Sequence, residues 1–359
     1  MQSQQPRAFA RRLARAALEI GAGLALAGLA LEAILRVGGA PAAVASPLHG
    51  FHRSDPVLGW SGTPNLRRRF VRPAFDVLVE HAADGFRRPD PTPPAAARER
   101  VLVLGDSLVW GWGVAQGELF TDHLQRALGP ALAVVNRGVN AYATSQELLL
   151  LERELERGPW SQVLLVFTPG DLEENVDAKR GRRPLFVLDG DRLLASPRSL
   201  APLMGPWRRW WKDASWAYLW LELAGNRTRE WLSPGAPVAA SERRDFRALP
   251  GWPVTARMLA EMAARARSAG ARFHVVYVPT DAALAAAPPD PLAEAAQAML
   301  ATLAAEQALP LVDLTPALAA RSHGRRLRFE TDEHPDPRGH RLIAEALLAA
   351  LPLTALATD

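Results

Sequence analysis

The chain of 359 residues contains no cysteine. Without thiols it can form neither disulfide bonds nor thiolate metal sites, and it has no cysteine nucleophile, whereas its redox compartment stays undetermined. Lysine is almost absent too, since only Lys179 and Lys212 occur among the 42 basic residues. Arginine keeps its proton up to about pH 12, so a chain with a net charge of only +4 still has a sequence pI near 10.0. The high pI therefore does not indicate a nucleic-acid partner, and no dense basic stripe with interleaved aromatic residues occurs.

Several short motifs of cofactor enzymes are also missing. There is no Walker loop, no glycine fingerprint of a dinucleotide site, and no His-x-x-x-His or Glu-x-x-His pair on one helix face. His274 lies in an apolar run and is interpreted as a core histidine. The sequence therefore predicts neither a metal nor a cofactor. Its 48% hydrophobic and 22% charged residues exclude a wholly disordered, collagen-like or polytopic membrane protein, and predict at least one globular domain.

The N-terminus has the pattern of a membrane segment. Residues 1–15 carry four arginines and no acidic residue, and residues 16–35 are apolar apart from Glu19 and Glu32. About 20 apolar residues in a helix cross a bilayer, and arginines on the leading side favour a cytoplasmic N-terminus. We therefore expect a single-pass anchor with the remaining chain outside the cytoplasm. Two alternatives stay open: a cleaved signal peptide, because Ala43–Ala45 resembles a cleavage site, and a buried globular helix.

From residue 99 onward, short apolar runs alternate with helical patterns. The runs are of the type that buried parallel strands show, at Val101–Leu104, Leu132–Val135, Val163–Phe167, Phe273–Val278 and Leu311–Val312. The helical patterns fall near residues 118–128, 144–157, 254–268, 291–307 and 338–350. This alternation predicts an α/β fold with a parallel sheet and helices on both faces. In such sheets ligands bind at the carboxyl ends of the strands.

The chain is expected to have three parts. Residues 1–38 form the cytoplasmic tip and the anchor, residues 39–98 an extracytoplasmic linker and extension, and residues 99–355 the α/β domain. Within the extension we expect an edge strand at Phe75–Glu80 and a stiff linker at Pro89–Pro94. Residues 175–250 interrupt the α/β pattern and are interpreted as an insertion that covers the site. Its five tryptophans between Trp207 and Trp220 suit a lid, a platform for sugar rings or an interfacial helix.

Two short segments could carry nucleophilic catalysis. The first predicted strand ends in Gly105-Asp106-Ser107, and a serine at a tight turn between a strand and a helix is where a nucleophile can be exposed. Near the C-terminus, His334 lies on a loop after the last predicted strand, with Asp332 two residues earlier. A serine needs a base to remove its proton, and the base needs an acid to orient it. His340 lies at the start of the next helix and is expected to pack or cap.

These segments resemble the SGNH/GDSL hydrolase family, in the family's order, over most of residues 100–350. Val101–Leu108 resembles the nucleophile block, and Asp332–His340 resembles the C-terminal block of acid and base. The resemblance implies a three-layer α/β/α flavodoxin-like fold, with Ser107 as nucleophile, His334 as general base and Asp332 as its acid. Asp336 is the second candidate for the acid.

The resemblance also implies an oxyanion hole, in which this chain departs from the family. The family uses the serine N–H, a glycine N–H after the second strand and an asparagine side chain after the third. Here Ala141 and Gly170 stand at the last two positions, so the N–H groups of Ser107 and Ala141 remain while Gly170 offers no side-chain donor. Loss of one oxyanion donor costs on the order of 100- to 1,000-fold in turnover. Asn140 and Asn175 are candidate replacements.

Four residues near these blocks are candidates for substrate binding: Asn140, Asp171, Asn175 and Trp110. For Asn175 the alternative is a helix cap. Trp110 and Trp112 follow the serine and are interpreted as lining or packing beneath the site, without a catalytic role.

Upstream, Asp55–Trp60 and Asp84–Arg87 resemble an extracytoplasmic, membrane-anchored bacterial branch of the family. That likeness implies a location in the cell inner membrane, with the catalytic domain in the periplasm. It further implies an acylated glycan or another small ester as the substrate. The leading hypothesis is thus a serine esterase that removes or transfers a small acyl group, such as acetyl, on an extracytoplasmic glycan. The alternatives are a catalytically weakened protein that binds or assembles glycans, and a lipid esterase or thioesterase.

Overall fold

The computed structural model describes residues 5–38, 48, 50–176, 183–195, 215, 217–218, 220–221, 251–284 and 291–351. The chain divides into two compact units, one of residues 1–49 and 204–236 and the other of residues 50–203 and 237–359. The segment Ala43–Ala45 and the tryptophans from Trp207 to Trp216 lie outside the described residues. The predictions about cleavage and about the tryptophan cluster therefore stay predictions.

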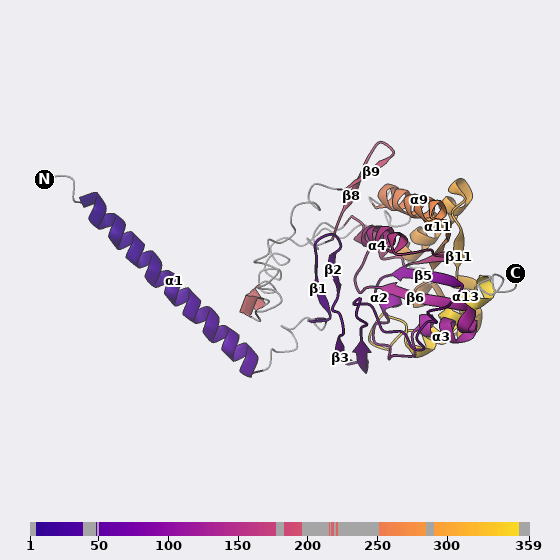
Figure 1. Ribbon diagram of the computed structural model, residues 1–359, viewed down its shortest axis with the longest axis horizontal. Helices are drawn as coiled ribbons and strands as arrows, with labels where there is room; N and C mark the ends of the chain where they lie inside the picture. Colours follow the sequence, from indigo (N-terminus) through magenta and orange to yellow (C-terminus); the bar gives the residue numbers. More distant parts are fainter. Residues whose placement is uncertain are drawn as a thin grey trace. The chain divides into compact units, whose positions relative to one another are not determined.

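The first unit contains the long helix α1, Gln5–Val37, drawn in indigo in Figure 1. Its segment Leu18–Val37 is long and apolar enough to cross a membrane, a property that signal sequences share. Leu24 and Leu29 on this helix are exposed. Glu32, an acidic residue within the apolar segment, accepts hydrogen bonds from Arg36 and from the Ser215 hydroxyl.

The second unit is built on a parallel sheet of five strands in the order β11-β10-β7-β5-β6. The strands are β5 (Glu99–Gly105), β6 (Leu132–Gly138), β7 (Gln162–Phe167), β10 (Arg272–Tyr277) and β11 (Leu311–Asp313). When these five strands are numbered 1 to 5 in chain order, their order across the sheet from the β6 edge is 2-1-3-4-5. This is the strand order of flavodoxin-like folds. The predicted parallel sheet is confirmed. The ends of the predicted strands lie within two residues of the observed ends, except that β6 continues three residues beyond the predicted Val135 to Gly138.

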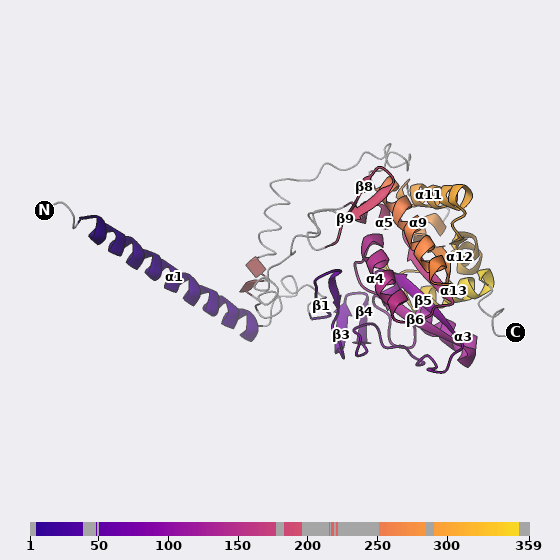
Figure 2. The same ribbon diagram turned by 45° about the horizontal axis from the view of Figure 1, so that its top comes forward.

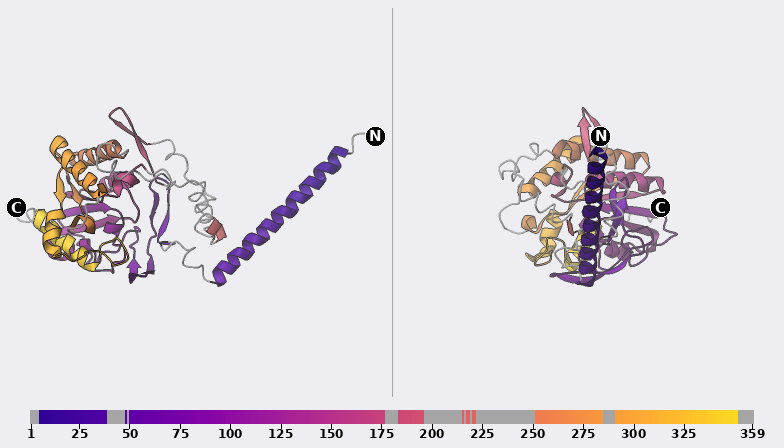
Figure 3. Two further views of the ribbon diagram at one scale, coloured as in Figure 1. Left: turned by 180° about the vertical axis from the view of Figure 1, so that it is seen from behind. Right: turned by 90° about the vertical axis from the view of Figure 1, so that its left-hand side faces the viewer.

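Helices cover both faces of this sheet, as predicted. One layer contains α4 (Thr144–Glu156), α9 (Trp252–Ser268) and α11 (Pro291–Gln307). The other contains α2 (Ser107–Trp110), α3 (Phe120–Leu128), α12 (Thr315–Ser322) and α13 (Pro337–Ala350). Helices α9 and α13 lie on opposite faces, because their buried residues belong to different apolar clusters. Figures 2 and 3 show these two helices, in orange and yellow, from further directions. The shorter helices are α5 (Asp171–Glu174), α10 (Asp281–Leu284) and the 3-10 turn η1 (Gly129–Ala131).

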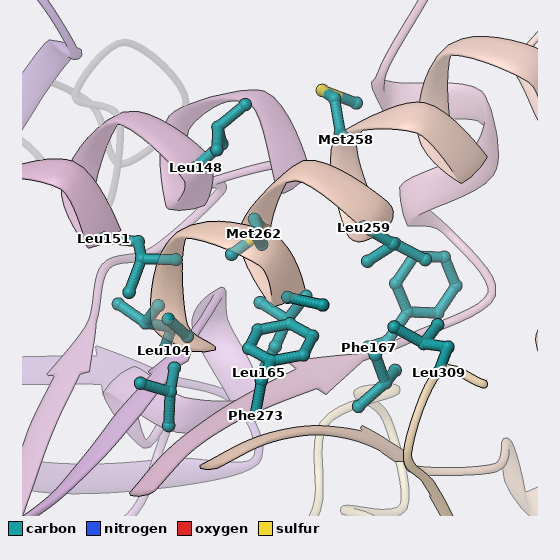
Figure 4. Packing of buried hydrophobic residues seen from close by; sticks show 14 of the residues in the cluster. Leu104, Leu148, Leu151, Leu165, Phe167, Met258, Leu259, Met262, Phe273 and Leu309 are labelled. Atoms are coloured by element: carbon teal, nitrogen blue, oxygen red, sulfur yellow. The ribbon is translucent and has the colours of Figure 1, made fainter. Parts of the chain in front are cut away.

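The core consists of two apolar clusters, one on each face of the sheet. Successive strand residues point to opposite faces, so Leu102 and Leu104 belong to one cluster whereas Val101 and Val103 belong to the other. Figure 4 shows the first cluster, where Met258, Leu259 and Met262 of α9 pack onto strand residues such as Leu165. Burial of one such side chain stabilises the fold by about 1.5–3 kcal/mol. The two clusters hold the strand ends, and the loops that follow them, in fixed positions.

Residues 50–98 form two antiparallel hairpins in the same compact unit as the sheet (Figure 1). They are β1 (His52–Asp55) with β2 (Gly59–Gly62), and β3 (Arg67–Arg72) with β4 (Phe75–Glu80). The expected strand at Phe75–Glu80 is therefore present. The segment expected as a linker lies against α3, since the Asp90 N–H donates to Asp122 and Arg126 donates to the Asp90 carbonyl. A further hairpin joins β8 (Phe186–Asp189) and β9 (Arg192–Ala195).

Candidate active site

Ser107 begins α2 directly after β5, an inner strand of the sheet. The turn between them is tight: a Cβ atom on Gly105 would lie 2.3 Å from the side chain of Val109, so only glycine fits there. The Asp106 carboxylate accepts a hydrogen bond from the Leu108 N–H and thereby caps the helix. The N–H of Ser107 is the first of the helix and has no partner within it. The serine is thus presented with its own N–H group available at the carboxyl end of the sheet.

The structure brings Ser107, His334 and Asp332 together in one chain of hydrogen bonds. His334 Nε2 lies 2.8 Å from Ser107 Oγ, and His334 Nδ1 lies 2.6 Å from Asp332 Oδ1. The His334 backbone N–H also donates to Asp332 Oδ1. Burial alone would raise the pKa of Asp332, but the hydrogen bonds from His334 and Trp112 outweigh it and hold that pKa below its ordinary value. Asp332 is therefore ionised at neutral pH and can accept a hydrogen bond from Nδ1–H of His334.

Trp112 completes this arrangement; from the sequence it is interpreted as lining or packing beneath the site, without a catalytic role. Its indole Nε1–H donates to Asp332 Oδ2 at 2.9 Å, and its ring stacks on His334 with centroids 4.8 Å apart and an interplanar angle of 20°. Trp112 thus contacts both the base and the acid. The signal in the sequence was its place five residues after Ser107, on the loop that leaves the nucleophile turn.

That loop is held from beneath by Arg87. The guanidinium is buried and donates to the carbonyl groups of Trp110, Gly111 and Val114. Burial lowers the pKa of Arg87 to about 10, which leaves the side chain charged at neutral pH. Trp110, predicted as a candidate for substrate binding, is itself only 1% exposed and donates its indole N–H to His81. The structure therefore places Trp110 in the core under the loop.

Ala141, predicted to supply an oxyanion donor, lies on the loop between β6 and α4 with a φ of 60°. This left-handed conformation is uncommon for a residue with a side chain. Among the described residues no hydrogen bond uses the Ala141 N–H as a donor. The neighbouring Asn140 side chain is 5% exposed and likewise makes no hydrogen bond to any described residue. Both groups are therefore available to a ligand.

Gly170 stands where the family has its asparagine, on the turn between β7 and α5. Its φ of −61° and ψ of −26° suit any residue. A Cβ atom there would meet nothing nearer than Thr168 Oγ1 at 3.9 Å, so the glycine is not required by space or by backbone conformation. The adjacent Asp171 carboxylate accepts hydrogen bonds from the N–H and the hydroxyl of Thr168. Asp171 is 3% exposed and serves this turn.

Asn175, the other candidate for the missing donor, is buried in a structural contact. Its amide donates to the hydroxyls of Thr144 and Thr255, at the starts of α4 and α9.

His340 is fully buried and accepts a hydrogen bond from the Phe120 N–H, which caps α3. Burial lowers the pKa of His340 to about 3. Asp336, the second candidate for the acid, caps α13 through the Gly339 N–H.

Buried carboxyl groups lie behind the nucleophile. Burial, followed by repulsion from neighbouring carboxylates, holds the pKa values of Glu147 and Asp171 well above their ordinary range. Burial also raises the pKa of Asp106, which neighbours both. Glu147 lies in the first turn of α4, and both of its oxygens lack a hydrogen-bond partner among the described residues. Sequence reasoning missed this residue, because the helical pattern gives no sign that a glutamate faces inward.

Within the part of the chain that the structure describes, no three His, Asp or Glu side chains are grouped as metal ligands. Ser107, His334 and Asp332 instead form an arrangement suited to acyl transfer, in which a base takes the proton of a hydroxyl and an acid orients the base.

Comparison with known proteins gives the chain a family. No curated protein matches its sequence. Solved structures with a similar fold include a G-D-S-L family lipolytic protein from Veillonella parvula (14% identity, 70% of this chain and 98% of that chain, TM-score 0.41). Another is a mutant acetylxylan esterase from Geobacillus stearothermophilus (13%, 71% and 94%, TM-score 0.42). The sequence profile of the GDSL-like Lipase/Acylhydrolase family matches residues 103–342, more than half of the chain and both catalytic segments, so the chain belongs to this family of ester-cleaving enzymes.

Proposed function

We propose that the protein is a serine esterase that removes or transfers a small acyl group, such as acetyl, on a glycan outside the cytoplasm. The observation that carries the proposal is the continuous hydrogen-bonded chain from Asp332 through His334 to Ser107, with atoms 2.6 and 2.8 Å apart. Family membership supports ester cleavage as the reaction class. The acetyl group and the glycan are the parts that the experiment below must test.

In this mechanism Ser107 Oγ attacks the ester carbonyl while His334 Nε2 takes the hydroxyl proton. The carbonyl oxygen becomes an oxyanion that accepts hydrogen bonds from the N–H groups of Ser107 and Ala141. Collapse of the intermediate breaks the ester bond, and His334 returns the proton to the leaving alcohol. Water, or a sugar hydroxyl in the transferase version, then attacks the acyl-enzyme and gives its proton to His334, and Ser107 is regenerated with that proton. Asp332 orients the imidazole and offsets its positive charge throughout.

The location is proposed from the N-terminal segment. Helix α1 has a stretch long enough to span a bilayer, and arginines lie on its leading side. In a Gram-negative cell this orientation places the catalytic unit in the periplasm, held to the inner membrane. Surface and secreted polysaccharides pass through that space, which makes an acylated glycan a suitable substrate.

A second candidate function is a binding or assembly protein on the same fold. Gly170 favours it, because the side-chain oxyanion donor of the family is missing there. Loss of one such donor costs on the order of 100- to 1,000-fold in turnover. A protein selected for glycan binding alone would tolerate that loss.

The test compares the full-length chain in detergent with its Ser107→Ala variant, using p-nitrophenyl acetate and then an acetylated xylo-oligosaccharide. We expect the variant to lose at least 1,000-fold in kcat, because it removes the hydroxyl that lies 2.8 Å from His334 Nε2. Ser161→Ala is the matched control, since that hydroxyl accepts a hydrogen bond from the Arg100 N–H at the opposite end of the strands. Its activity should equal that of the unmodified chain.

Equal rates for the unmodified chain and Ser107→Ala would refute the esterase. Glycan affinity that survives Ser107→Ala, without phosphonate labelling of the serine in the unmodified chain, would establish the binding protein. Rates that rise with acyl-chain length from two to twelve carbons would instead identify a lipid esterase or thioesterase. Cleavage confined to short acyl groups supports the proposal.

A further inference from the structure

The peptide group that carries the proposed oxyanion donor is held by a residue of the N-terminal extension. Trp60, on strand β2, donates its indole Nε1–H to the Asn140 carbonyl at 3.1 Å. The Asn140 carbonyl and the Ala141 N–H belong to the same peptide group. Because a trans peptide is planar, its C=O and N–H point in opposite directions. Fixing the carbonyl of Asn140 therefore fixes the direction of the Ala141 N–H.

The next peptide group is held from the other side. Arg183 donates from Nη2 to the Ala141 carbonyl at 2.8 Å, and from Nε to the side chain of Gln146. The same guanidinium pairs with Glu174. Arg183 is 2% exposed, so these bonds are shielded from water and its charge is satisfied by fixed partners. Both peptide groups that flank the Ala141 Cα are thus restrained, which keeps this alanine at its uncommon φ of 60°.

Further contacts between the extension and the α/β domain fix the position of Trp60. Asp55 forms a two-bond ion pair with Arg153 of α4, with both N–O distances 2.9 Å, and it accepts the Leu58 N–H. The Tyr142 hydroxyl donates to the Trp60 carbonyl at 2.7 Å, and the two rings meet edge to face with centroids 5.8 Å apart. Two hydrogen bonds therefore join the hairpin β1–β2 to the Ala141 loop, one donated by Trp60 and the other by Tyr142.

We infer that Trp60, assisted by Arg183, is a positioning residue that aligns the Ala141 N–H for the developing oxyanion. The inference rests on the proposed function and extends it, because the residue lies in the extension and outside the segment that the family profile matches. Its action is through the backbone, with no contact to the reacting atoms. Because Gly170 supplies no side-chain donor, the orientation of the remaining N–H groups matters more for turnover.

The test uses Trp60→Phe in the full-length chain, since phenylalanine keeps an aromatic ring beside Tyr142 and lacks the indole N–H. We expect kcat on p-nitrophenyl acetate to fall about tenfold with little change in KM, because oxyanion donors act mainly in the transition state. The specific readout is the rate ratio between this ester and its thiono analogue, in which C=S replaces C=O. Sulfur accepts hydrogen bonds weakly, so a misaimed donor lowers the rate on the oxygen ester more and the ratio should fall.

The matched control is Trp160→Phe. Trp160 is buried, and like Trp60 it donates its indole N–H to a backbone carbonyl, here that of Glu154 at the far end of α4. It should change stability without changing the ratio of the two esters. Arg183→Met is a second variant with the same expected fall in the ratio, and it decides the matter if Trp60→Phe is too unstable to assay.

Each outcome has a defined meaning. Unchanged kcat in Trp60→Phe, or an equal fall on both esters, would overturn the positioning role, since a general loss of structure affects both substrates alike. If hydrolysis by the unmodified chain does not depend on Ser107, the proposed function fails and this inference fails with it. A lower ratio in Trp60→Phe and an unchanged ratio in Trp160→Phe would establish the role.

Discussion

At the scale of single residues, the proposed site combines a hydrogen-bonded serine, histidine and aspartate with a proposed oxyanion hole that lacks a side-chain donor. Ser107, His334 and Asp332 are linked by short hydrogen bonds, and Trp112 restrains both the base and the acid. Gly170 provides no donor, yet its backbone and its surroundings accept a side chain. Nothing in the packing of the described residues requires a glycine at this position. The missing donor can therefore be restored without rebuilding the loop.

Gly170→Asn should raise activity. An asparagine amide there adds the third donor of the family's oxyanion hole. We expect kcat on p-nitrophenyl acetate to rise by at least tenfold. One such donor contributes on the order of 100- to 1,000-fold in other enzymes. Gly170→Ala fills the same space without a donor and should leave kcat within about twofold. If both variants behave alike, the turn does not face the oxyanion.

At the scale of elements, helix α4 carries an unusual feature in its first turn. Glu147 is 1% exposed and its carboxyl oxygens lack partners among the described residues, while Asp171 and Asp106 repel its charge. An ionised carboxylate in such a place is costly, whereas the neutral acid is tolerated. These buried surroundings therefore favour the protonated form of Glu147.

Glu147→Gln should stabilise the protein increasingly as the pH rises. The folded-state pKa of Glu147 lies well above its ordinary 4.5, so its contribution to stability is fully present below pH 4.5 and is lost as the pH rises through the folded pKa. Glutamine resembles the neutral acid and does not titrate. The difference in Tm between the variant and the unmodified chain should be small at pH 5 and positive at pH 8. A difference that is constant over this range would contradict a raised pKa of Glu147 in the folded state.

The elements were largely predictable from the sequence, whereas the contacts between them were not. The runs Val101–Leu104 and Val163–Phe167 predict buried strands because a strand covered on both faces is apolar at every position. Ser107 and His334 could be proposed as partners because both follow predicted strands at one edge of the sheet. Trp60 and Arg183 could not, because each acts through a single hydrogen bond to the backbone of a distant loop. No periodicity or spacing in a single sequence encodes such a contact.

At the scale of the whole molecule, three buried histidines are distributed over the second unit. Burial lowers the pKa values of His52 and His81 to about 4 and that of His340 to about 3, from an ordinary value of 6.5. These side chains are neutral in the folded protein at any pH above those values. In the unfolded chain they take up protons once the pH falls below 6.5. The folded state therefore loses stability relative to the unfolded state on acidification.

His340→Gln provides the measurement. The stabilisation from the neutral His340 is fully present above pH 6.5 and is lost as the pH falls toward 3, by at most about 1.4 kcal/mol per pH unit for one proton. The Tm of the unmodified chain should therefore exceed that of the variant most at pH 7.5, and the gap should narrow by pH 5. The raised pKa values of Glu147 and Asp171 change stability with pH in the opposite direction. Both chains contain these residues, so their effects cancel in the difference in Tm. A gap that widens on acidification would contradict the assigned direction.

The distance in sequence between Ser107 and His334 has a consequence for biosynthesis. The two residues are 227 positions apart, and strand β5 leads directly into the first of them. At about 5–20 residues per second, a ribosome needs roughly 10–45 s to reach the histidine after it has passed the serine. During that interval the nascent chain has the proposed nucleophile without its proposed base. The proposed site can therefore cleave no ester until synthesis has passed His334.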